Sequence, residues 1–153
     1  MRFISIAAIT IAAALAGCTS MPSMNSGGVP PGMNDKGEVI DSRKVEPGSG
    51  TKVTGIDGFE GEIGKPGKNS KFTQLQIGMT NNQVVKLIGE PTTQASRLTA
   101  KVYIPMYTGR DRNRIMYVYK GQGRLVFSGG AFGNDKTGTL LYIIHNPNES
   151  GEL

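Results

Sequence analysis

The chain contains a single cysteine, Cys18, which directly follows a largely apolar run and two small residues. The run extends from Phe3 to Leu15, and Arg2 is the only charged residue before the cysteine. A short positive start, an apolar stretch and small residues at its end are the layout of a secretory signal peptide. The run is too short for a membrane-spanning helix, which takes about 20 apolar residues. We therefore expect residues 1–17 to be removed as a signal peptide and the folded part to lie downstream.

Residues 15–18, Leu-Ala-Gly-Cys, resemble the lipobox of bacterial lipoproteins. The resemblance implies that the thiol of Cys18 is linked to diacylglycerol and that Cys18 becomes the lipidated first residue of the mature chain. The alternative is a secreted protein with an ordinary buried cysteine. With Cys18 lipidated, no thiol remains for a disulfide, a metal site or a nucleophile. Several acyl chains on one residue exceed the two signals that stable membrane anchoring requires.

The residue after the cysteine is Thr19. In lipoproteins that this chain resembles, an aspartate there tends to retain the protein in the inner membrane, so we expect the outer membrane and its periplasmic face. The formal net charge is +5, and removal of residues 1–17 takes away one positive charge. Moderate basicity can indicate nucleic acid as a partner, but the periplasm offers none. Anionic lipid, acidic proteins and plain solubility are the remaining explanations.

Residues 18–50 are rich in Gly, Ser, Pro and Asn and show no sustained apolar periodicity. Such a segment buries too little apolar surface to offset the entropy lost on ordering. We therefore predict a disordered, flexible tether over 18–50, with an r.m.s. span of roughly 30 Å, between the lipid and a folded domain.

A weak hairpin is predicted next. Residues 52–56 and 59–63 flank Asp57-Gly58, a dipeptide that suits the positive backbone angles of a type I′ turn. Glycines interrupt both runs, so residues 51–69 are assigned as a short β-ribbon or irregular extension. Whether this part packs on the core or joins the tether is left open by the sequence.

The clearest local signal is a short helix over residues 81–88. Thr80 can cap its first turn and Gln83, three residues later, can return a hydrogen bond, which makes a capping box. Gly89 suits the left-handed conformation that ends a helix, and Pro91 prevents its continuation. Three apolar residues repeat at helical spacing: Val84, Leu87 and Ile88.

Three strands are predicted after the helix. Residues 114–119 alternate in hydrophobicity, a glycine-rich turn leads to 124–128, and 139–144 form a third apolar run. The segment 97–109 contains Pro105 and is assigned as an edge strand or a loop. A helix followed by an antiparallel meander is an α+β plan.

The segment 77–91, I-G-M-T-x-x-Q-V-x-x-L-I-G-x-P, resembles the SmpA/OmlA (BamE-like) family of outer-membrane lipoproteins. Residues 117–119 and 125–127 are similar to the first two strands of that family. The resemblance covers residues 70–146, and residues 147–153 follow as a C-terminal tail. It implies an α+β fold in which two short helices pack on a three-stranded antiparallel sheet, preceded by the disordered tether.

The same resemblance implies a non-enzymatic role as a binding or scaffold subunit, in β-barrel assembly at the outer membrane or in envelope integrity. Similar folds occur in protein inhibitors of β-lactamases, so a periplasmic inhibitor of a secreted hydrolase is a second expectation. A structural lipoprotein that binds lipid or cell wall is a third.

Catalytic and metal-binding patterns are not found in the sequence. His145 is the only histidine, which excludes a histidine triad or a multi-histidine metal site by count. Strand alternation predicts a surface or strand-end position for it. Glu60 and Glu62 are close on one strand, but a solvated face explains them better than a glycosidase pair. We therefore expect no enzyme activity, no cofactor and no metal.

A cluster of basic residues is the best candidate for a contact surface. Arg110, Arg112 and Arg114 lie within five positions, and Lys120 and Arg124 follow across the predicted hairpin. Arginine is enriched in interfaces and forms paired hydrogen bonds with phosphate or carboxylate. We interpret the cluster as a contact for an acidic partner or anionic lipid, with a merely solvated loop as the alternative.

Overall fold

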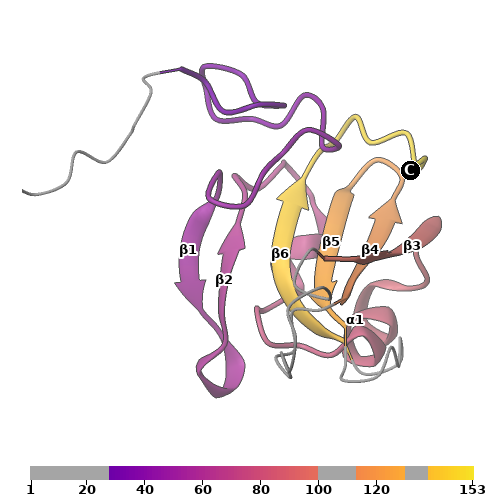
Figure 1. Cartoon of the computed structure of the whole chain (residues 1–153). Coiled ribbons are helices and arrows are strands. Elements are labelled where there is room, and N and C mark those ends of the chain that lie inside the picture. Colours follow the sequence, from indigo (N-terminus) through magenta and orange to yellow (C-terminus); the bar gives the residue numbers. More distant parts are fainter. Residues whose placement is uncertain (1–27, 100–112, 130–137) are drawn as a thin grey trace, which may run out of the picture.

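The computed structural model describes residues 28–99, 113–129 and 138–153. They form one six-stranded mixed sheet with the strand order β1-β2-β6-β5-β4-β3 (Figure 1). The strands are β1 (Thr51–Thr54), β2 (Glu60–Ile63), β3 (Thr93–Leu98), β4 (Asn113–Tyr119), β5 (Gly123–Ser128) and β6 (Thr139–His145). All neighbouring pairs are antiparallel except β2 and β6, which are parallel.

The expected fold of two helices on a three-stranded antiparallel sheet is wrong. Within the described ranges there is one α-helix, α1 (Asn81–Ile88), together with two 3-10 turns, η1 (Ile56–Gly58) and η2 (Lys71–Gln74). The predicted meander is present as β4, β5 and β6, but it forms only the centre of a larger sheet. The β1–β2 hairpin extends it on one side and β3 extends it on the other.

Helix α1 has the predicted caps. The Thr80 hydroxyl accepts a hydrogen bond from the Gln83 backbone N–H at 3.3 Å, and the Gln83 amide oxygen accepts one from the Thr80 N–H at 2.8 Å. Gly89 ends the helix with a φ of 93°. None of the helices in the described residues is long and apolar enough to cross a membrane.

The main core lies between α1 and one face of the sheet. Val84 and Ile88 project from the helix and are buried against strands β4, β5 and β6. Phe72 from η2 fills the same layer, with its ring edge-on to Tyr119 at 5.5 Å between centroids. The other buried members of this layer are Leu75, Ile77, Ile115, Tyr117, Leu125, Phe127, Leu140 and Ile143.

The β1–β2 hairpin turns as predicted and joins the sheet. Asp57 and Gly58 have φ angles of 54° and 73°, the positive values that a type I′ turn requires. Strand β2 then pairs with β6 through Glu62 opposite Tyr142. A domain that starts at residue 70 would therefore lack two strands of the sheet.

Residues 28–50 form the N-terminal strap, which crosses the sheet at the end where β6 finishes (Figure 1). The disordered tether expected over 18–50 is therefore wrong from residue 28 onward. An antiparallel bridge joins Met33 to Val39, and Val39 is only 6% exposed. The average composition of the strap is polar, but its few apolar residues and its turn hydrogen bonds are sufficient to order it on the sheet.

The C-terminal tail packs on the same end of the sheet. The Thr93 hydroxyl donates a hydrogen bond to the Gly151 carbonyl at 2.7 Å, which ties the tail to β3. Glu149 is buried. The strap and the tail together thus cover part of the sheet face that lies opposite α1.

Candidate ligand-binding pocket

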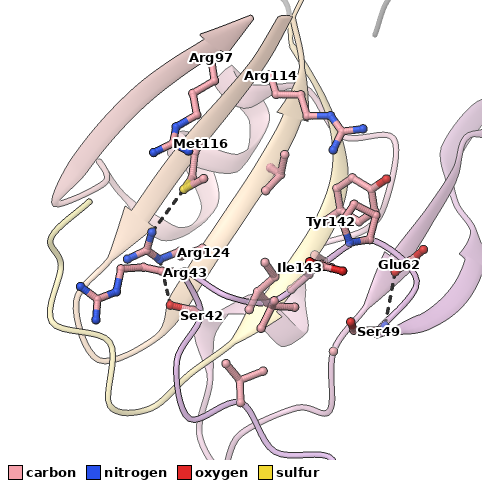
Figure 2. A pocket seen from close by; sticks show the side chains of 18 of the residues that line it. Ser42, Arg43, Ser49, Glu62, Arg97, Arg114, Met116, Arg124, Tyr142 and Ile143 are labelled. Carbon is pink, nitrogen blue, oxygen red and sulfur yellow. Dashed lines mark hydrogen bonds between the residues drawn. The ribbon is translucent and has the colours of Figure 1, made fainter. Parts of the chain in front are cut away.

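A pocket of about 270 Å³ lies between the N-terminal strap and the sheet face opposite α1 (Figure 2). Its floor is a row of side chains on three neighbouring strands, since Met116 on β4 is opposite Val126 on β5, and Val126 is opposite Tyr142 on β6. Ile144 lies two residues after Tyr142 on the same strand and also lines the pocket. The floor is therefore largely apolar.

The strap supplies the opposite wall. Val39, Val45 and Pro47 line the pocket from this side. The strap is held near β2 because the Gly48 N–H donates to the Glu62 carboxylate, with distances of 2.7 and 2.9 Å to its two oxygens. The strap thus encloses the apolar pocket, and its hydrogen bonds to Glu62 hold it in place.

A second polar contact holds the strap at β5. Arg124 and Glu149 are ion-paired, and their side chains are 4% and 3% exposed. The Arg124 Nε donates to Ser42 Oγ of the strap at 2.9 Å, and the Ser42 hydroxyl donates to the Glu149 carboxylate. Burial alone would raise the pKa of Glu149, but the hydrogen bonds from Arg124 and Ser42 and the nearby positive charge outweigh it and lower the pKa.

Two arginines lie at one end of the pocket. Arg97 on β3 is directly opposite Arg114 on β4, so both side chains project from the same face. The Arg114 guanidinium lies over the Tyr142 ring, 5.4 Å from its centroid. Arg97 is exposed, and no carboxylate in the described ranges pairs with it. Like charges directly opposite each other on neighbouring strands repel each other.

The other basic residues near the pocket have different surroundings. Arg43 is paired with Asp41 of the strap at 3.2 Å. Lys120 is exposed in the β4–β5 turn and does not line the pocket.

The predicted basic surface is therefore divided by the structure. Arg114 lies at the pocket, whereas Arg124 is buried under the strap and neutralised by Glu149, so it is not part of an exposed surface. Arg110 and Arg112 lie outside the described residues. Cys18, the predicted lipidation site, lies outside them as well.

The sequence did not indicate Arg97, Tyr142 or Ser42 as site residues. The sequence predicts an edge strand or a loop over 97–109, whereas β3 spans Thr93–Leu98. The position of Arg97 opposite Arg114 depends on the β3–β4 register. Tyr142 was placed correctly on a strand, but its neighbour Arg114 is two strands away in the sheet. Strand alternation around 97 and 142 is the only signal that could have suggested these positions.

His145 is the last residue of β6, so the predicted strand-end position is confirmed, but the alternative of a surface position is wrong because the side chain is buried. A register irregularity opposite Val126 and Phe127 breaks the alternation of β6, so that Leu140 and Ile143 both face the core. His145 then faces the core as well, with its Nδ1 3.0 Å from Ser70 Oγ. Burial lowers the pKa of this imidazole.

No group of three or more His, Cys, Asp or Glu side chains in the described part of the chain is placed to hold a metal ion. Comparison of the chain with protein-family models, curated proteins and solved structures finds no match in any of the three. The resemblance to the SmpA/OmlA family thus stays a prediction from the motif at residues 77–91. The pocket is concave and largely apolar and carries a few polar side chains, which are general features of ligand sites.

Proposed function

We propose that this chain is a lipid-anchored, non-enzymatic binding protein of the bacterial envelope, with the pocket under the strap as its ligand site. The lipobox at residues 15–18 supports the anchor, and Thr19 supports the periplasmic face of the outer membrane. The observation that carries the binding role is the pocket itself, in which an apolar floor ends at the Arg97–Arg114 pair.

The shape of the site favours a small or chain-like ligand over a flat protein surface. Ligand sites are concave, mostly apolar and fitted with a few polar groups that orient the ligand. The row from Met116 to Tyr142 supplies the apolar floor, and the arginine pair supplies the polar end. A lipid anchor would keep this site close to the membrane, where amphiphilic molecules are concentrated.

The earlier expectation of a barrel-assembly subunit and the expectation of a hydrolase inhibitor both rest on the family resemblance. The pocket favours the third expectation, a lipoprotein that binds lipid-like molecules. Recovery of a protein partner by affinity capture from the envelope would favour one of the first two expectations instead.

The proposed function is tested by asking whether a ligand copurifies. A Cys18→Ala variant with a cleavable secretion signal is purified from the periplasm without detergent and examined by native mass spectrometry. We expect a non-covalently bound organic ligand. A Val45→Trp substitution fills the pocket from the strap and should remove it, because Val45 lines the pocket.

Val29→Trp is the matched control, because Val29 is on the same strap, is 46% exposed and does not line the pocket. It should keep the ligand. The proposal is wrong if no ligand is found in any form, or if Val45→Trp and Val29→Trp carry the same ligand.

A further inference from the structure

We propose that strand β1 is an association edge, along which two copies of this chain pair antiparallel, with Lys52 of each copy opposite Thr54 of the other. The inference concerns a different part of the molecule from the pocket and does not depend on the proposed ligand. It follows from the main-chain groups that β1 leaves unpaired, from the register that satisfies them and from the side chains around them.

Strand β1 is at the end of the strand order and, in the described part of the chain, pairs with β2 on one side only (Figure 1). The Gly55 N–H donates to the Phe59 carbonyl at 2.8 Å, one step beyond the paired residues Thr54 and Glu60. Hydrogen-bonded and non-hydrogen-bonded pairs alternate along an antiparallel ladder. The main chain of Val53 therefore faces β2, and that of Thr54 faces away from it.

By the same alternation, the main-chain N–H and C=O groups of both Lys52 and Thr54 point to the open edge of the sheet. Strand β2 agrees with this orientation, because the Gly64 N–H donates to the Ile143 carbonyl at 2.8 Å, which turns the odd-numbered residues of β2 toward β1. No described residue hydrogen-bonds to the main chain of Lys52 or Thr54. Unpaired groups on an edge strand are a template for the addition of another strand.

A second copy of β1 satisfies all of these groups in one antiparallel register. When Val53 of one copy is opposite Val53 of the other at a two-fold axis, Lys52 of each copy is opposite Thr54 of its partner. These two residues then exchange their N–H···O bonds, and the two Val53 residues form the closer, non-hydrogen-bonded pair between them.

The neighbouring registers are less favourable. A shift in one direction places Lys52 opposite Lys52, so that like charges repel each other. A shift in the other direction places Lys52 opposite Ile56, whose N–H already donates to the Ile77 carbonyl at 2.8 Å. The main-chain groups and the charges thus favour the same register, with Val53 on the axis.

The side chains also complement each other in this register. Val53 packs against the core, and Val53 of the partner copy would continue that apolar layer across the axis. On the other face, Lys52 is opposite Thr54 of the partner copy, which is itself opposite Glu60 on β2. Neither Lys52 nor Glu60 is in an ion pair within the described ranges, so each can interact with the other copy across the short threonine.

The contact is short, so we expect association to be weak in solution. Strand β1 has 4 residues, whereas stable interfaces bury about 1,200–2,000 Å². Both copies use the same edge, so the pair closes on itself as a dimer and does not grow into a fibre. An anchor that confines the chain to one membrane surface would raise the effective concentration for pairing.

Cysteine crosslinking tests the register. The full secreted chain carries Cys18→Ser, so that an introduced cysteine is its only thiol. Val53→Cys places two thiols opposite each other with Cα atoms about 4.5 Å apart, within the range for a disulfide. Thr51→Cys is the matched control on the same face of β1, because the two copies of residue 51 would lie about 13 Å apart along the strands. Under mild oxidation we expect Val53→Cys to form a covalent dimer at least about tenfold faster than Thr51→Cys.

A proline tests the main-chain bonds without an added thiol. Thr54→Pro removes an N–H that points away from β2, and proline is accepted on an edge strand at such a position. It should weaken the association measured by sedimentation velocity at least about tenfold relative to Thr54→Ala, which keeps the N–H. The two variants should have similar urea midpoints.

Three results would overturn the proposal: equal crosslinking rates for Val53→Cys and Thr51→Cys, a monomer at every concentration, or equal association of Thr54→Pro and Thr54→Ala. If Thr54→Pro does not fold, the comparison of the two cysteine variants decides. Capture of another protein along β1 by a chain that does not self-associate would also contradict pairing between copies.

Discussion

Arg124 and Glu149 form a buried, two-pronged ion pair, with 3.0 Å from the arginine Nε to one carboxylate oxygen and 3.0 Å from Nη2 to the other. The pair joins β5 to the C-terminal tail. Ser42 of the strap hydrogen-bonds to both side chains and so connects the strap to the pair. This contact and the Gly48–Glu62 hydrogen bonds together hold the strap over the pocket.

Removal of one partner should destabilise the fold strongly, because it leaves the other charge buried and unpaired. We expect Arg124→Met or Glu149→Leu alone to lower the free energy of unfolding by about 3–5 kcal/mol, as measured by urea denaturation. The double substitution should lower the free energy of unfolding by much less than the sum of the two single losses. Additive losses would show that the two residues act independently.

Acid should weaken the same contact. The folded pKa of Glu149 is lowered from its ordinary value of 4.5, so its stabilising contribution is complete above pH 4.5 and is lost as the pH falls through the folded pKa. The free energy of unfolding should decrease in that window for the unsubstituted chain and decrease less for Glu149→Gln. Urea titrations at several pH values measure the difference.

His145 provides an internal comparison in another window. Burial lowers its pKa from 6.5, so the unfolded chain takes up the proton first and stability is lost as the pH falls from about 6.5 through the folded pKa. A His145→Gln variant should lack that part of the pH dependence and keep the part below pH 4.5. If the free energy of unfolding of His145→Gln depends on pH as that of the unsubstituted chain does, the effect assigned to His145 is contradicted. If Glu149→Gln and the unsubstituted chain have the same pH dependence below pH 4.5, the effect assigned to Glu149 is contradicted.

Features encoded within a few residues were predictable from the sequence. The cap of α1 depends on Thr80 and Gln83, which are three positions apart, and the hairpin turn depends on Asp57-Gly58. The meander of β4, β5 and β6 also follows from local alternation and glycine-rich turns. In each case the signal and the structure it produces lie in the same short segment.

Features that depend on distant segments were not predictable. The parallel pairing of β2 with β6 joins Glu62 to Tyr142, and nothing in either strand specifies it. A charged residue in a strand is usually exposed, so Arg124 was assigned to a surface, whereas its partner Glu149 lies 25 residues away. The pocket was missed for the same reason, since its walls come from the strap and from five strands.

Gly61 should not tolerate a side chain. A Cβ at this position would lie 2.3 Å from the Leu141 carbonyl oxygen and 2.7 Å from Ile77 Cγ2, where the hairpin approaches β6. Gly61→Ala should therefore lower the free energy of unfolding by about 1–3 kcal/mol or more. Gly67→Ala is the control, because its nearest neighbour would be Pro147 Cδ at 3.9 Å, and it should be close to neutral. Similar urea midpoints for both would contradict the close approach of β2 and β6.

Cys18→Ala should abolish lipidation. The substitution removes the only thiol in the chain, so labelling with radioactive palmitate should disappear and the protein should leave the outer-membrane fraction. Fractionation followed by immunoblotting of a C-terminally tagged chain measures both effects. Continued labelling and membrane partitioning of the variant would contradict the lipid anchor.

The most direct test of the central claim, that the pocket under the strap binds a ligand, is photo-crosslinking with a small apolar probe that carries a diazirine. After irradiation of the full chain, peptide mapping should locate the adducts in the strap around Val45 and in the floor strands at Met116 and Val126. Val45→Trp should lose them and Val29→Trp should retain them. Adducts on the α1 face, or adducts that persist in Val45→Trp, would contradict the assignment of this pocket as the ligand site.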